Sequence, residues 1–186
     1  MLFRSISRAN AELDKRTSDI AGDERAAVAR AVGLGAVKYA DLANDRVKDY
    51  VFDWDRMLAF EGNTAPYLQY ACARIASILR RAGDEASDLT GTIIDVTAPQ
   101  ERALAMALLA FDAAVHDTID KLGPHRLCTY LFDLAQTFTS FYDACPVMKD
   151  DVPTDVRRSR LALCQLTLRV LSTGLDLLGI DVPDRM

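Results

Sequence analysis

"PHRLCTYLFDLAQTFTSFYDAC", residues 124–145, carries a continuous apolar row with a helical period over about five turns. The members of this row recur every three or four residues, which places them on one face of an α-helix: Leu127, Leu131, Leu134, Phe138 and Phe141. Burying each such side chain is worth about 1.5–3 kcal/mol before the entropy cost is subtracted. The stretch therefore predicts a long helix inside a helical core.

The rest of the chain repeats this helical pattern between short breaks at Gly22, at residues 83–99, at Gly123-Pro124 and at Cys145-Pro146. Residues 44–55, "NDRVKDYVFDWD", have extended character but no second strand to pair with, so we expect a crossing segment there. The predicted fold class is all-α, a helical bundle. The expected helices are Ile6–Arg16, Glu24–Leu42, a helix from the cap Thr64 to about Gly83, Glu101–Leu122, Pro124–Cys145 and Thr154–Leu178.

Composition is that of a globular protein, with 186 residues of which 50% are hydrophobic and 26% charged. A net charge of −5 argues against a protein that coats nucleic acid, but it does not exclude a local surface that reads RNA. No apolar run reaches the roughly 18 residues of a membrane helix, so no membrane partner is expected. We interpret the four cysteines, at positions 72, 128, 145 and 164, as buried thiols in a reducing cytoplasm.

No pattern in the sequence indicates a catalytic, cofactor or metal site. The phosphate-binding glycine motifs and the nucleophile elbow do not occur. His116 and His125 are too few and too isolated to form a zinc site. The aspartates between residues 41 and 55 alternate with lysine and arginine, which is typical of a solvated charged face.

"FEGNTAPYLQYACAR", residues 60–74, begins as a loop and continues as a helix that Thr64 can cap. Tyr67, Tyr70 and Arg74 recur along one flank of that helix, at intervals of three and four residues. In one interpretation the tyrosines only border the core. In the other, their rings stack on unpaired RNA bases while the arginine meets phosphate or a base edge. Spacing alone favours the first interpretation.

Four long stretches resemble bacterial arginyl-tRNA synthetases, which are class I enzymes, and they occur in the family's order. They are "GAVKYADLANDRVKDYVFDWDRMLAFEGNTAPYLQYACAR" (35–74), "LFDLAQTFTSFYDACPV" (131–147), "RSRLALCQLTLRVL" (158–171) and "GLDLLGIDVPDRM" (174–186). By this resemblance, residues 1–59 are a helical lead-in similar to the end of the synthetase core. Residues 60–186 are similar to the DALR anticodon-binding domain, itself an all-α bundle.

The resemblance implies that the partner is tRNA(Arg), bound at its anticodon loop in support of arginyl-tRNA aminoacylation, with no role for DNA. It also implies a set of tRNA-binding residues. Asn63 belongs to this set because the family's "EGNTAP" loop rearranges when tRNA binds. The full set is Tyr67, Tyr70, Arg74, Tyr142, Met186 and Asn63.

The family activates arginine with ATP and Mg²⁺ on a domain that carries a His-x-Gly-His signature, and that signature is absent here. We therefore expect no cofactor in this chain and no activity from it alone, with a separate catalytic chain as a further candidate partner. The chain would be an excised domain, a truncated gene product or a free-standing paralogue. The alternative function is a helical protein-interaction module that does not bind tRNA.

Overall fold

All regular structure in the described part of the chain is helical. The computed structural model describes residues 2–14, 20 and 22–186, and no strand occurs among them, so the predicted all-α fold is confirmed. The helices are α1 (Leu2–Asp14), α2 (Gly22–Leu42), α3 (Trp54–Met57), α4 (Ala65–Ala82), the 3₁₀ helix η1 (Gly83–Ala86), α5 (Pro99–Leu109), α6 (Phe111–Asp120), α7 (Pro124–Ala144) and α8 (Thr154–Leu177).

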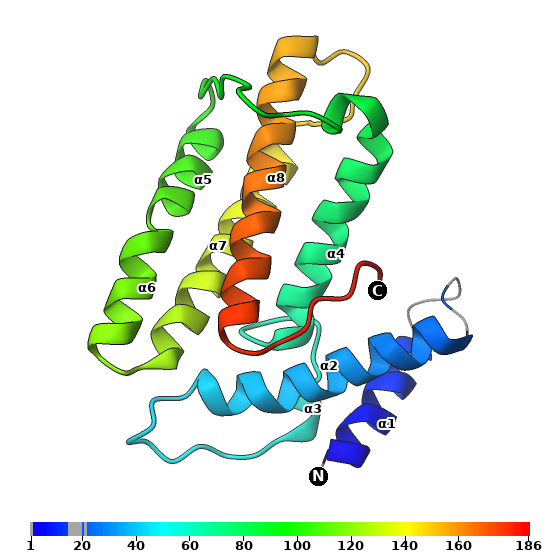
Figure 1. Ribbon diagram of the computed structural model, residues 1–186, viewed down its shortest axis with the longest axis vertical. Coiled ribbons are helices and arrows are strands. Elements are labelled where there is room, and N and C mark those ends of the chain that lie inside the picture. Colours follow the sequence, from blue (N-terminus) through cyan, green and yellow to red (C-terminus); the bar gives the residue numbers. More distant parts are fainter. Residues whose placement is uncertain (1, 15–19, 21) are drawn as a thin grey trace.

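The helices form an upright bundle that stands on a crossing pair. Helices α4, α7 and α8 and the consecutive α5 and α6 run side by side, whereas α2 lies across their lower ends with α1 beneath it (Figure 1). Helix α7 contacts α2, α4, α5, α6 and α8. It is therefore the central element, as its broad apolar face requires.

Two clusters of buried side chains hold the bundle together. The main core is built from α4, α5, α7 and α8, and it includes the whole predicted face of α7. The lower core joins α1 and α2 to the end of α3. Its buried members are Ala9, Leu13, Val28, Ala29, Val32, Ala36 and Leu58.

Gly33 allows α1 and α2 to cross at backbone contact. A Cβ atom at this position would lie 2.7 Å from the Ile6 Cα atom, and backbone cannot yield as a side-chain end can. Ser5, whose carbonyl carbon lies 2.9 Å from the same point, is fully buried at the crossing. Glycine at position 33 thus permits the close approach of these two helices.

Several predicted helix bounds were wrong. Helix α1 begins at Leu2 instead of Ile6, and the expected end at Arg16 lies outside the described residues. Helix α2 begins at Gly22, two residues before the expected start. The single helix expected over Glu101–Leu122 is two helices, which meet at Ala110. No glycine or proline marks this break. Because α5 and α6 both pack on α7, tertiary packing sets its position.

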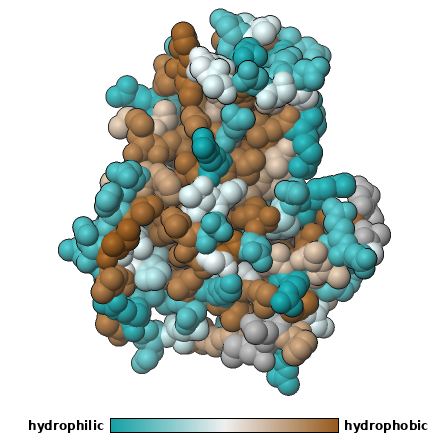
Figure 2. Space-filling view, viewed as in Figure 1, coloured by the Kyte–Doolittle hydropathy of each residue, from teal (hydrophilic) through white to brown (hydrophobic). Residues whose placement is uncertain are grey.

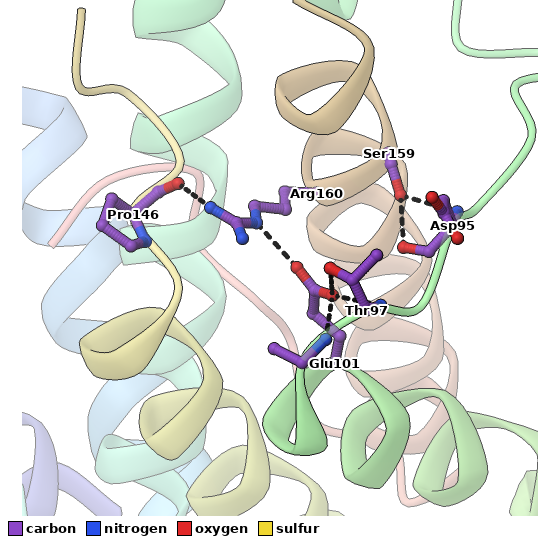
Figure 3. Close-up of polar contacts among 7 residues, drawn as sticks. Asp95, Thr97, Glu101, Pro146, Ser159 and Arg160 are labelled. Carbon is purple, nitrogen blue, oxygen red and sulfur yellow. Dashed lines mark hydrogen bonds and ion pairs between the residues drawn. The ribbon is translucent and has the colours of Figure 1, made fainter. Parts of the chain in front are cut away.

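A buried polar cluster fastens the upper end of the bundle (Figure 3). One Glu101 carboxylate oxygen accepts hydrogen bonds from the backbone N–H groups of Thr97 and Ala98, both at 2.9 Å, and from the Thr97 hydroxyl at 3.1 Å. The other oxygen accepts from Arg160 Nε at 2.7 Å. Arg160 Nη1 in turn donates to the Pro146 carbonyl oxygen at 2.7 Å. The cluster thus ties the start of α5 to α8 and to the turn that follows α7.

Hydrophobic side chains also reach the surface along the α5–α6 flank, on the left of Figure 2. Large exposed members of this flank are Met106, Leu109, Ile119 and, just after α6, Leu122. Among the described residues, no helix is both long enough and apolar enough to cross a membrane.

Candidate nucleic-acid interface

The first turn of α4 is fixed to the loop that precedes it. The Thr64 hydroxyl accepts a hydrogen bond from the Tyr67 backbone N–H at 3.3 Å and donates to the Ala59 carbonyl at 2.7 Å. Gly62 has a φ of 72°, which suits glycine in the turn. The predicted Thr64 cap is confirmed, and it sets the direction in which the next residues of α4 point.

The two tyrosines of α4 have different surroundings. Tyr67 is half-buried, and its ring packs edge-on against Phe132 of α7, with ring centroids 5.7 Å apart. Tyr70 leaves 42% of its surface exposed and meets Phe60 at 6.4 Å, also edge-on. Tyr67 therefore borders the core, whereas the Tyr70 ring is open to a ligand on its outer side.

Arg74 and Tyr142 are brought together from α4 and α7, although 68 positions separate them in the sequence. The Arg74 guanidinium lies over the Tyr142 ring, 5.0 Å from its centroid, and exposed cation–π pairs of this kind are worth about 0.5–1 kcal/mol. Tyr142 stacks in turn on Phe138, with centroids 6.1 Å apart. No hydrogen bond or ion pair joins Arg74 to another described residue. Its N–H donors are therefore available to an acceptor from outside.

Asn63 is exposed on the loop before α4, but its amide reaches inward to Tyr39. The Tyr39 hydroxyl lies 2.6 Å from Asn63 Oδ1 and 2.9 Å from the Cys128 carbonyl oxygen. The single Tyr39 hydroxyl hydrogen is shared between these two acceptors, and the Asn63 NH₂ group has no partner among the described residues. Burial raises the pKa of Tyr39 above its ordinary value, which keeps this hydroxyl protonated.

Met186 lies at the edge of the lower core. It is half-buried and packs on that cluster, as do Phe60 and Trp54. Phe60, which packs on the same cluster as Met186, also touches the Tyr70 ring. Of the six predicted residues, Arg74 and Tyr142 contact each other. The other four contact residues outside the set: Tyr67 on Phe132, Tyr70 on Phe60, Asn63 on Tyr39, and Met186 on the lower core.

Spacing along the sequence did not reveal the residues that support these side chains. Phe60, Phe132 and Phe138 each hold one of the tyrosine rings, and Tyr39 holds Asn63. Phe138 is visible in the sequence only as a member of the core row of α7. The described residues include no group of three histidine, cysteine or acidic side chains arranged to hold a metal ion.

Comparisons with known proteins match both parts of the chain. A family model described as the DALR anticodon binding domain matches residues 68–186, and a model of the class I tRNA synthetase (R) catalytic domain matches residues 1–54. Arginine–tRNA ligase of Thermobifida fusca is 56% identical over all 186 residues, and that of Pseudoalteromonas translucida is 50% identical. The chain spans about a third of the length of these curated relatives, 32% in both cases.

Solved structures give the same result. The arginyl-tRNA synthetase of Thermus thermophilus superposes with a TM-score of 0.88 at 37% identity, covering 100% of this chain and 31% of that one. The enzyme of Plasmodium falciparum gives a TM-score of 0.86 at 28% identity, covering 100% and 33%. The resemblance noted in the sequence is confirmed, and these matches lend no support to a helical protein-interaction module.

Proposed function

Because this chain belongs to the DALR anticodon-binding domain family, we propose that it binds the anticodon loop of tRNA(Arg) and so supports arginyl-tRNA aminoacylation. The observation that carries this proposal is the exposed surface of α4 and α7. There the open Tyr70 ring lies one helical turn from Arg74, and Arg74 is held over Tyr142 with no polar partner among the described residues.

We assign each proposed residue a role from its surroundings. Tyr70 offers a ring face on which an unpaired base can stack, an interaction worth about 1–3 kcal/mol per base. Arg74 donates to a phosphate or to a base edge, and Tyr142 holds its guanidinium in place. Tyr67, half-buried against Phe132, supports the helix and reaches the RNA only by its outer edge.

Asn63 and Met186 complete the proposed surface. Since Asn63 Oδ1 is directed to the Tyr39 hydroxyl, its NH₂ group is left to donate to a base carbonyl oxygen or ring nitrogen. Binding that draws Asn63 toward the RNA would break the contact with Tyr39, which fits a loop that rearranges. Met186 contributes an apolar, polarisable side chain beside the region of Phe60.

We further propose that residues 1–59 continue a class I catalytic domain and that residues 60–186 form the anticodon-binding part. The matches to residues 1–54 and 68–186 support a boundary of this kind. Activation of arginine with ATP and Mg²⁺ would then take place on parts of that domain outside these 186 residues, on the same or a separate chain. Four buried, unpaired cysteines agree with a cytoplasmic location.

The proposal is tested by measuring the affinity of Tyr70 and Arg74 variants for tRNA(Arg), by fluorescence anisotropy at several salt concentrations. Tyr70→Ala should lower the affinity by one stack, about 1–3 kcal/mol, while Tyr70→Phe keeps the ring and the affinity. Arg74→Ala should reduce the salt slope by about one unit if it meets phosphate, or relax base preference if it meets a base edge.

Arg102→Ala is the matched control, because Arg102 is an exposed arginine on α5 with no partner among the described residues. Arg102→Ala removes the same charge as Arg74→Ala, and it should leave the affinity for tRNA within about twofold of that of the unaltered protein. Thermal melts of every variant separate binding from folding. If Tyr70→Ala lowers the melting temperature but leaves affinity per folded molecule unchanged, the tyrosine belongs to the core edge and the proposal is wrong.

A further inference from the structure

The last eight residues form a strap that runs back from the end of α8. Figure 1 shows this segment passing from the lower end of α8 toward α2 and the start of α4. The Ile180 side chain is 2% exposed and anchors the strap in the main core. The far end, Met186, packs on the lower core, so the strap connects both clusters.

Three side chains hold the strap by its backbone carbonyl oxygens. Lys38 of α2 donates to Gly179, Gln69 of α4 donates to Asp181 at 2.7 Å, and Arg80 of α4 donates to Asp184 at 3.2 Å. Because these contacts use backbone oxygens, they fix the path of the chain without requiring particular side chains at residues 179–184. Two of the three donors belong to α4, the helix that carries Tyr70 and Arg74.

Gln69 is the buried member of the three. Its side chain is fully buried, and its NH₂ group donates one hydrogen bond to the Asp181 carbonyl oxygen and one, at 3.2 Å, to the Ala31 carbonyl oxygen of α2. Two carbonyl acceptors require two N–H donors at one point, which the glutamine amide supplies and a glutamate, methionine or leucine cannot. Its Oε1 atom has no hydrogen-bond partner among the described residues, so the NH₂ group alone orients the side chain.

Gly35 of α2 makes room for this arrangement. A Cβ atom there would lie 2.9 Å from Gln69 Nε2 and 3.1 Å from Ile180 Cγ2. Helix α2, helix α4 and the strap therefore meet at one tightly packed point, and Gln69 is the residue that touches all three. The next residue in the sequence, Tyr70, is exposed on the same turn of α4.

We propose that Gln69 is a positioning residue for the nucleic-acid interface: by holding the strap at Asp181, it fixes Met186 in register with the Tyr70 face of α4. This inference rests on the proposed function for its tRNA readout, but the placement of the strap is testable without tRNA. When the hydrogen bond to Asp181 is lost, the strap opens more often, and Met186 spends less time at the surface it completes.

The experiment compares Gln69→Met, which keeps the size and removes both N–H donors, with the unaltered chain. The first readout is the rate at which carboxypeptidase removes Met186 from the folded protein, followed by mass spectrometry. This rate tracks the population of the open strap when opening is fast relative to cleavage. We expect it to rise roughly two- to tenfold, the factor that corresponds to one net hydrogen bond.

Arg80→Met is the second variant, because Arg80 is exposed and its replacement does not threaten folding. Arg81→Met is its matched control: it removes the same charge from the next residue, which is equally exposed and has no partner among the described residues. Release of Met186 should accelerate in Arg80→Met and stay at the unaltered rate in Arg81→Met. For Gln69→Met the control is Gln165→Met, an exposed glutamine in the middle of α8.

The second readout is affinity for tRNA(Arg), measured with Met186 present and with Met186 removed. If Gln69 acts through the strap, Gln69→Met lowers affinity in the intact protein and has no further effect once Met186 is gone. If Met186 release is unchanged in folded Gln69→Met and in Arg80→Met, the inference is overturned. If release accelerates but the unaltered chain does not bind tRNA(Arg), the strap is confirmed and the proposed function fails.

Discussion

Replacing Glu101 by glutamine removes the charge from the most deeply buried carboxylate among the described ion pairs, because the Glu101 side chain is 1% exposed and that of Arg160 is 14% exposed. To keep the three bonds from Thr97 and Ala98, the glutamine must place its oxygen where Oε2 now lies. Its NH₂ group then takes the place of Oε1 and faces Arg160 Nε, a donor against a donor.

The expected cost follows from these contacts. Hydrogen bonds to a charged group are worth about 1.5–3 kcal/mol each, and breaking one side of a buried ion pair typically costs about 3–5 kcal/mol. For a domain of this size each kcal/mol shifts the melting temperature by about 2–4 °C. Glu101→Gln should therefore melt about 6–20 °C below the unaltered protein at pH 7.

The pH dependence has a definite sign. Burial alone would raise the pKa of the Glu101 carboxyl, but the hydrogen bonds from Ala98, Arg160 and Thr97 outweigh it and hold the pKa below its ordinary value. A carboxyl with a lowered folded-state pKa contributes its full stability above the unfolded value, about 4.3, and loses it as the pH falls through the folded value. The difference in melting temperature between the two proteins should accordingly close in acid.

Circular dichroism melts between pH 7 and pH 3 measure both effects. Glu85→Gln is the matched control, since Glu85 pairs with Arg157 at 3.3 Å but its side chain is 41% exposed. Loss of this exposed ion pair should lower the free energy of unfolding by no more than about 1 kcal/mol. Combining Glu101→Gln with Arg160→Met removes both partners and should recover part of the loss. A melting temperature within about 3 °C of the unaltered protein at pH 7, or a gap that persists in acid, would refute the reasoning.

Three further predictions concern activity, packing and the thiols. The isolated chain should show no arginine-dependent exchange between ATP and pyrophosphate above a blank without protein, since the regular structure of its described residues is helical and includes no α/β nucleotide-binding fold. Exchange above the blank would contradict this. Gly33→Ala should lower the free energy of unfolding by about 1–3 kcal/mol, because the new Cβ atom would meet the Ile6 backbone. In the same urea titration, Gly123→Ala should lower the free energy of unfolding by less, because the nearest atoms there belong to the side chains of His125 and Arg126. Burial raises the pKa of Cys72 and Cys164 to about 12, so both thiols should resist a thiol reagent at pH 8 until urea unfolds the protein; rapid labelling of the folded chain would count against it.

Local periodicity was sufficient to predict α7 and the cap of α4. The five core residues of α7 are all buried because a helix places i, i+4 and i+7 on one face, whatever the rest of the fold does. The start of α1 was missed because the buried residue there is Ser5, a polar residue that interrupts an apolar period. The break at Ala110 was missed because no turn residue marks it and packing on α7 sets its position.

The candidate interface could be predicted only in part, for the same reason. Tyr67, Tyr70 and Arg74 follow from helical spacing, but spacing cannot show that Tyr67 is half-buried while Tyr70 is open. The partners that complete the surface lie far away in the sequence: Tyr142 under Arg74, Tyr39 beneath Asn63 and Asp181 beside Gln69. Each of these contacts requires the tertiary fold.

The charge of the chain bears on how such a surface would discriminate between RNAs. With a net charge of −5, the body of the protein repels a phosphate backbone as a whole, so nonspecific attraction contributes little. In the proposed complex, affinity must then come from the few residues that touch the loop, chiefly one open tyrosine ring and one arginine without a polar partner among the described residues. Stacking on Tyr70 requires an unpaired base, which a duplex does not present. An acidic body with a small contact surface would therefore favour an exposed loop over other nucleic acid without requiring an extensive basic patch.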